Sequence, residues 1–174
     1  MTPSEIAITE PAAGPERKVN PSAIGLATTT FYRNWYPGAA QDEHTVDKVR
    51  GDLALQTIRE AQSKGFQVAV VDGGSSSTFR QALTEMGITI HEEKEKGMSG
   101  SRRQAFKEVS KLDGVRVIAW AEPEKVSIAR DCLPEAAMPI LQGAADVVVP
   151  KRDDAAFATY PDYQARYEQR ANYL

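Results

Sequence analysis

The chain has 174 residues, of which 41% are hydrophobic and 26% are charged, and its formal net charge at neutral pH is −3. This length suits one domain with a buried core. The slight acidity argues against a protein whose main task is to grip nucleic acid or an anionic membrane. Cys132 is the only cysteine, which excludes an internal disulfide, so we expect a cytoplasmic protein. No apolar run reaches the roughly 20 residues of a membrane span, and the N-terminus lacks the pattern of a signal peptide.

The N-terminal part of the chain predicts a tail, a strand and an aromatic loop. Residues 1–22 contain four prolines and little apolar periodicity, which predicts a flexible tail. The segment 24–32 is apolar at its start and predicts the first strand. The loop 33–37 adds two aromatic residues and a cation. Either it binds a flat or phosphorylated ligand, or Phe31 and Trp35 simply cover the end of the sheet.

A helix and a second buried strand come next. Apolar residues between Thr45 and Lys64 recur at helical spacing, and Gly65 follows as a helix stop. The β-branched run Val68–Val71 then predicts a buried parallel strand. Together these segments predict a β-α-β unit with a right-handed crossover.

The second strand ends in a group of small and acidic residues, namely Asp72, Gly73, Gly74 and Ser75, with two more serines behind them. Glycines allow a ligand to approach the main chain closely. An acid at the carboxyl end of a buried strand, before a helix, lies where open α/β sheets bind ligands. The alternative is a plain connection between strand and helix, with Ser76 or Ser77 as the helix N-cap.

The rest of the chain continues the alternation of helices and strands. The pattern first predicts a helix over 77–86, a strand over 88–91 and a helix from the loop at 97 to about 112. It then predicts a strand over 115–120 and a helical region over 126–142 that two prolines interrupt. A turn with a fifth strand over 143–150 follows. The segment 153–174 carries tyrosines at helical spacing, and this stripe could pack on a second copy of the chain. We therefore expect a three-layer α/β/α sandwich with a mainly parallel sheet, formed by residues 23–152.

Two further groups of charged residues could bind ligands. Arg102 and Arg103 stand at the start of a predicted helix, whose free amides could bind phosphate; alternatively both arginines are solvated. Glu122 and Glu124 follow the strand over 115–120 and could converge on Mg²⁺ or Mn²⁺, which prefer oxygen ligands. The alternative is that the two glutamates are surface acids that pair with neighbouring cations.

Four motifs therefore lie in order at one edge of the predicted sheet: Thr28–Tyr32, Val70–Ser75, Lys96–Arg102 and Ala121–Lys125. In this order they resemble the nucleotide-binding half of GT-A glycosyltransferases, particularly the family-2-like enzymes. Those enzymes have a threonine-aromatic end to the first strand, a V-V-D-D-G-S end to the second, a glycine-to-arginine helix start and a D-x-D motif. The resemblance covers about residues 24–152. It implies a Rossmann-like GT-A core that binds a nucleotide-diphospho-sugar donor and transfers the sugar to an unknown acceptor.

The resemblance also implies a role for each matching position. Thr29, Phe31 and Tyr32 would lie near the nucleobase, and Asp72 would accept a hydrogen bond from a base N–H. Gly73, Gly74 and Ser75 would let the nucleotide lie close to the backbone. Arg102 would lie beside the diphosphate or orient the acidic groups. Glu122 and Glu124 would take the D-x-D place, holding the ribose and a divalent ion on the diphosphate.

The chain departs from that family in two ways, and two other functions stay open. The D-x-D place reads Glu-Pro-Glu, and no residue is identified as a catalytic base. One alternative is a non-catalytic α/β module that binds a nucleotide or a protein at the same rim. Another is a phosphoryl-transfer enzyme with Asp72 as the working acid, although Asp72-Gly73-Gly74 lacks the D-x-D-x-T pattern of one phosphatase class.

Overall fold

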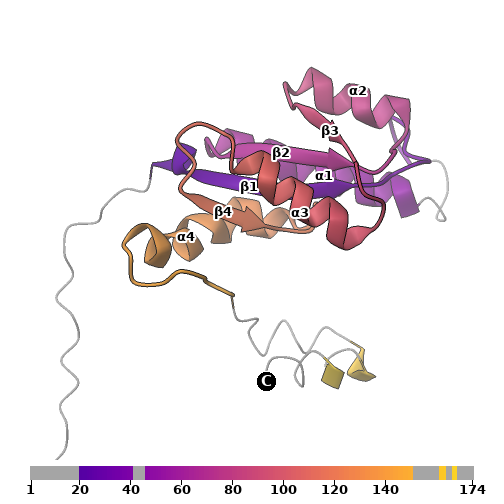
Figure 1. Cartoon of the computed structure of the whole chain (residues 1–174). Helices are drawn as coiled ribbons and strands as arrows, with labels where there is room; N and C mark the ends of the chain where they lie inside the picture. The colour runs from indigo at the N-terminus through magenta and orange to yellow at the C-terminus, as the bar shows by residue number, and fades with distance from the viewer. Residues whose placement is uncertain (1–19, 41–45, 151–160, 164–165, 168–174) are drawn as a thin grey trace, which may run out of the picture.

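A computed structural model describes residues 20–40, 46–150, 161–163 and 166–167 of the protein, and the first two of these ranges form a Rossmann-like α/β fold (Figure 1). Within them a four-stranded, all-parallel sheet has the order β3-β2-β1-β4. The elements are β1 (Ile24–Thr30), α1 (Val46–Ser63), β2 (Gln67–Asp72), α2 (Ser77–Glu85), β3 (Ile90–Glu92), α3 (Met98–Val109), β4 (Val117–Trp120) and α4 (Leu133–Leu141). A 3₁₀ turn, Pro21–Ala23, precedes β1, and a π-helical turn, Ile128–Cys132, precedes α4.

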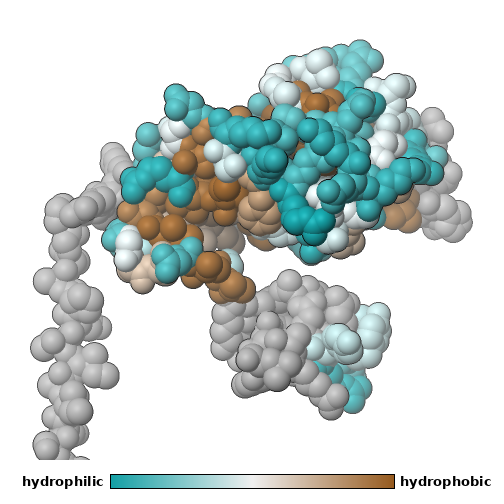
Figure 2. All heavy atoms as spheres, in the orientation of Figure 1, coloured by the Kyte–Doolittle hydropathy of each residue, from teal (hydrophilic) through white to brown (hydrophobic). Residues whose placement is uncertain are grey.

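The sheet lies between two helical layers, as expected for buried parallel strands. One face packs on α1, α2 and α4, and the other packs on α3. The alternation along β1 explains this division, because Leu26 belongs to the core on the α1 side and Ala27 to the core under α3. Figure 2 shows hydrophobic residues (brown) at the surface around α4 and the segment that follows it.

The contact between α3 and β1 is unusually close at Gly25. A Cβ atom at this position would lie 2.3 Å from Cγ1 of Val109, the last residue of α3. The missing side chain therefore sets how near the helix can approach the sheet.

The predicted order of elements is confirmed from β1 to α4, with shifted bounds. The first strand ends at Thr30 rather than at residue 32, because the Tyr32 amide turns away to donate to Oγ of Ser75. The third strand is Ile90–Glu92 instead of 88–91. The three-layer arrangement with a parallel sheet is confirmed as well.

The prediction of a fifth strand within 143–150 is wrong. These residues form turns, bends and irregular backbone, and the side chains of Val147 and Val149 are exposed. A β-branched run becomes a strand only where a partner edge and a buried face are available to it. In the described part of the chain β4 consequently forms one edge of the sheet.

Other predicted segments lie largely or wholly outside the described residues. These are the tail at 1–22, of which only 20–22 are described, and the C-terminal segment at 153–174 with its tyrosine stripe. Among the helices that are described, none combines the length and the apolar character that crossing a membrane requires.

Candidate functional site at the carboxyl edge of the sheet

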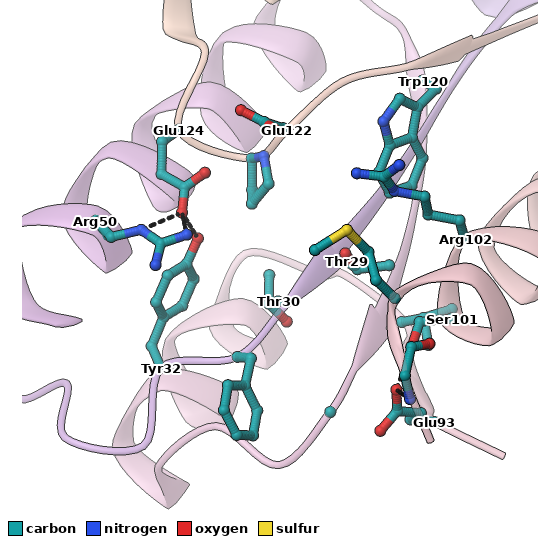
Figure 3. A pocket seen from close by; sticks show the side chains of 16 residues that line it. Thr29, Thr30, Tyr32, Arg50, Glu93, Ser101, Arg102, Trp120, Glu122 and Glu124 are labelled. Carbon is teal, nitrogen blue, oxygen red and sulfur yellow. Dashed lines mark hydrogen bonds and ion pairs between the residues drawn. The ribbon is translucent and has the colours of Figure 1, made fainter. Parts of the chain in front are cut away.

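A cavity of about 480 Å³ lies where β1, β2 and β4 end, and its size is typical of small-molecule sites. Its walls come from the end of β1, the turn after β2, the loop before α3, the start of α3 and the segment after β4 (Figure 3). Because the strands are parallel, their carboxyl ends meet at this edge, which is where open α/β sheets bind ligands. The residues predicted from sequence that line it are Thr29, Phe31, Tyr32, Gly73, Arg102, Glu122 and Glu124.

Asp72 does not line this cavity, although it stands at the end of β2. Its carboxylate is almost fully buried and accepts hydrogen bonds from within the protein: Oδ1 from Oγ1 of Thr30 (2.8 Å), and Oδ2 from the amides of Gly74 (3.1 Å) and Ser75 (3.0 Å). Gly74 has φ of +109°, which favours glycine in this turn. Asp72 thus organises the connection to α2.

Gly74 and Ser75 belong to that turn and also lie outside the cavity lining. The hydroxyl oxygen of Ser75 accepts a hydrogen bond from the Tyr32 amide (2.9 Å). Ser76 is the N-cap of α2, since its Oγ accepts from the Phe79 amide (3.2 Å). The simpler interpretation of this stretch, a capped strand-to-helix connection, therefore describes its contacts.

One wall of the cavity is formed by a hydrogen-bonded group of Tyr32, Arg50 and Glu124. The Tyr32 hydroxyl donates to Oε1 of Glu124 (2.7 Å). The same oxygen accepts from Nε of Arg50 (2.9 Å) and forms an ion pair with Nη2 of Arg50 at 2.7 Å (Figure 3). Burial, together with the bond to Glu124, raises the pKa of Tyr32 far above its usual range. The hydroxyl consequently stays protonated and remains a donor.

The opposite wall is formed by Arg102 and Trp120. The guanidinium carbon of Arg102 lies 5.0 Å from the centroid of the Trp120 ring, and that ring stacks in turn on Phe106 (centroids 6.0 Å apart). The Nε of Arg102 is buried and has no hydrogen-bond partner within the described residues. Arg102 is therefore a cation held by a ring, with a donor that remains unsatisfied.

The two roles suggested for the aromatic residues of this region fall to different side chains, Trp35 and Phe31. Trp35 is buried, packs on Phe79 and donates its indole N–H to Asp52 (3.0 Å), so it covers the end of the sheet. Phe31 is half-exposed and lines the cavity.

Three lining residues lie outside the four motifs predicted from the sequence, namely Arg50, Glu93 and Trp120. Arg50 lies within α1, where helical periodicity gives no reason to separate it from other solvated charges. Glu93 lies in a run of charges before α3. Trp120 ends a strand whose hydrophobic pattern it simply continues.

The carboxylates of this edge fit a divalent ion only in part. Glu122 is more than half exposed and its Oε2 lies 4.0 Å from Nζ of Lys125, whereas Oε1 of Glu124 is already engaged by Tyr32 and Arg50. Across the described ranges no group of three or more His, Cys, Asp or Glu side chains is arranged to hold a metal ion. A divalent ion here would therefore need further ligands from substrate phosphates, as Mg²⁺ commonly does.

The fold and the cavity define a Rossmann-like α/β protein with a candidate ligand site at the carboxyl edge of its sheet. No protein-family model, curated protein sequence or solved structure matches the chain.

Proposed function

We propose that the cavity binds a nucleotide-diphospho-sugar, and that the chain is a glycosyltransferase of GT-A type or the donor-binding core of one. The observation that carries this proposal is the shared lining of one cavity by residues from four distant segments. Phe31, Gly73, Arg102 and Glu122 are far apart in sequence and line the same space. The cavity combines an exposed aromatic side chain, a cation with an unsatisfied donor and carboxylates, which suit a base, a diphosphate and its counter-ion respectively.

Arg102 is the residue that would bind the diphosphate. Arginine binds phosphate oxygens through several N–H groups in a fixed geometry. The Trp120 ring holds the guanidinium in place before a ligand arrives, so little side-chain entropy would be lost on binding. The arginine also favours the charge that develops on the diphosphate as the bond to the sugar breaks.

Glu122 and Glu124 would hold Mg²⁺ or Mn²⁺ against the diphosphate, with Glu122 free to do so and Glu124 tied to Arg50. When such an ion is bound, it would neutralise negative charge on the leaving diphosphate. Arg50 would have to leave Glu124 to approach a phosphate, and its 55% exposed side chain has solvent around it in which to move. The acceptor oxygen would replace the diphosphate at the anomeric carbon, and no residue is assigned as its base.

Titration of the full chain with UDP and GDP by calorimetry, with and without Mn²⁺, tests this proposal. We expect at least one of them to bind, and to bind more tightly with the metal. Arg102→Ala should weaken binding by roughly 10-fold or more, since a charge-assisted hydrogen bond contributes about 1.5–3 kcal/mol. Arg103→Ala is the matched control, because Arg103 is exposed, pairs with Glu95 (3.0 Å) and does not line the cavity. Absence of binding to both nucleotides would refute the proposal.

The contacts of Glu124 also support a second candidate, a non-catalytic module that binds a nucleotide or protein at this rim. A carboxylate that already neutralises Arg50 and accepts from Tyr32 is less available to a metal ion. This module would bind a nucleotide equally well after Glu122→Gln and Glu124→Gln, and would release no sugar from a UDP- or GDP-sugar. Metal-dependent sugar release that either variant reduces would decide for the enzyme.

A further inference from the structure

Glu93 offers the cavity a carboxylate oxygen that the protein itself does not use. It follows β3, and its backbone amide donates to the carbonyl of Asp72 (3.0 Å). Its Oε1 accepts from the Gly97 amide (3.2 Å) and from the Ser101 hydroxyl. No hydrogen bond or ion pair engages its Oε2 among the residues that the structure describes. Figure 3 places Glu93 beside Ser101, away from Arg50 and Glu124.

This free oxygen borders a slot above Gly73. A Cβ atom on Gly73 would lie 3.5 Å from Oε2 of Glu93, 3.3 Å from Cδ2 of Phe31 and 3.6 Å from the carbonyl oxygen of Thr30. Because glycine has no such atom, the space between the aromatic ring and the carboxylate stays open. Oε2 of Glu93 and the Thr30 carbonyl oxygen are both hydrogen-bond acceptors, and the carbonyl already accepts from the Gly73 amide (2.9 Å). The slot therefore suits a flat group that presents donors at its edge.

We propose that Glu93 reads the nucleobase of the bound nucleotide and selects guanine; this inference rests on the proposed function. Asp72 is not available for this role, because both its oxygens accept hydrogen bonds inside the turn. Guanine presents N1–H and the N2 amino group side by side, and both are donors that the free Oε2 of Glu93 can accept. Uracil presents one N–H between two carbonyl oxygens, and a carboxylate repels these two oxygens. Adenine presents a ring nitrogen acceptor beside its amino group, so its edge meets the same repulsion.

The base preference of the full chain is measured by calorimetric titration with GDP, UDP and ADP in the presence of Mn²⁺. The wild-type chain should bind GDP at least about 5-fold more tightly than UDP or ADP, which is the lower end of what well-placed base contacts discriminate. Glu93→Gln should reverse the pattern. Its amide oxygen can keep the contacts to Gly97 and Ser101, which turns the NH₂ group toward the slot. Donors would then face the guanine donors, so GDP binding should fall about 10-fold or more while ADP and UDP do not lose affinity.

Glu95→Gln is the matched control, because Glu95 lies in the same loop, is exposed and pairs with Arg103 outside this cavity. It should leave the preference for GDP unchanged. Gly73→Ala is a second variant that does not alter the contacts of Glu93 to α3. Its methyl group would narrow the slot and should lower GDP affinity, with unchanged far-UV circular dichroism.

The outcomes separate this inference from the proposed function. Binding of GDP, UDP and ADP with equal affinity, or a GDP preference that survives Glu93→Gln in the folded variant, would overturn the role of Glu93 and leave the nucleotide site standing. If the wild-type chain bound none of the three nucleotides, both proposals would fall together. A GDP preference that Glu93→Gln and Gly73→Ala remove, and Glu95→Gln does not, supports the inference.

Discussion

Asp72 shows how one acidic residue at a strand end can serve the backbone instead of a ligand. Its two oxygens accept from Thr30, Gly74 and Ser75 while its side chain is almost fully buried. A buried charge of this kind is tolerated because both oxygens are hydrogen-bonded within the protein and Nε of Arg80 lies 3.9 Å from Oδ2. Another acidic residue, Glu93 in the loop after β3, keeps one oxygen available to the cavity.

Replacement of Asp72 tests its structural role. Asp72→Ala should lower the free energy of unfolding by about 1–3 kcal/mol, because two amides and the Thr30 hydroxyl lose their acceptor. Asp72→Asn should cost less, since its amide oxygen can still accept from the turn while its NH₂ group donates to Oγ1 of Thr30. The free energies of unfolding of the two variants are compared by urea unfolding. Equal losses would show that the charge, and not the acceptor geometry, is what the turn requires.

Helix α1 contains a glycine, Gly51, and the packing of the helix depends on its lack of a side chain. Gly51 faces Trp35, and a Cβ atom there would lie 2.3 Å from Cδ1 of the indole. The indole is held from several sides, by Phe79 (5.4 Å between centroids) and by its N–H bond to Asp52. Arg50, next to Gly51, reaches the cavity from this helix. The glycine therefore lets α1 approach the loop that follows β1.

The Gly51→Ala substitution tests whether helix propensity or packing has the larger effect on stability at this position. In an exposed helix interior the substitution would stabilise by about 0.5–1 kcal/mol. Here we expect a loss of about 1–3 kcal/mol, because the methyl group overlaps a ring that has little room to move. Gln56→Ala, at an exposed position of the same helix, should change stability by no more than about 0.5 kcal/mol. Thermal unfolding of the two variants decides; a stabilised Gly51→Ala would contradict the packing argument.

The alternation of strands and helices could be predicted from the sequence because each buried strand is a short β-branched run and each helix has its own apolar period. The convergence of Phe31, Gly73, Arg102 and Glu122 followed from the rule that parallel strands end at one edge. Contacts that depend on the exact rotation of an element could not be predicted. Arg50 reaches Glu124 only because of how α1 is turned about its axis. Likewise, whether Asp72 or Glu93 faces the cavity depends on hydrogen bonds in the turns.

The fifth strand was wrongly predicted for a related reason. The run Val147–Val149 has the composition of a strand, but strand formation is a property of a pair of segments. The composition alone cannot tell whether β4 offers its edge to these residues.

At the scale of the whole molecule, Glu108 connects α3 to its surroundings. Its side chain is 8% exposed, accepts from Nζ of Lys111 and lies 3.7 Å from Nδ1 of His91, which belongs to β3. The hydrogen bond from Lys111 is the main reason that the pKa of Glu108 is lowered in the folded protein. A carboxyl with a lowered pKa stabilises the fold above its unfolded pKa, and this contribution is lost as pH falls through the folded value.

Glu108→Gln should therefore reduce the free energy of unfolding near pH 7, and the difference from wild type should shrink as pH falls below about 4.3, the ordinary glutamate pKa. Urea unfolding at several pH values measures it. Glu85→Gln, at an exposed site at the end of α2, should show no comparable dependence. A difference that stays constant down to low pH would mean that packing, and not ionisation, accounts for the effect of Glu108.

The close approach of β1 and α3 at Gly25 connects one wall of the cavity to the packing of the sheet. Val109 seats one end of α3 against the strand, and the other end carries Ser101 and Arg102 at the cavity. A side chain at position 25 would displace this end of α3, and the shift would extend along the helix toward Arg102. Arg50, on the opposite wall, stands next to Gly51, where α1 packs equally closely against Trp35. Each of the two cations of the cavity is therefore carried by a helix that a glycine allows to approach its neighbour closely.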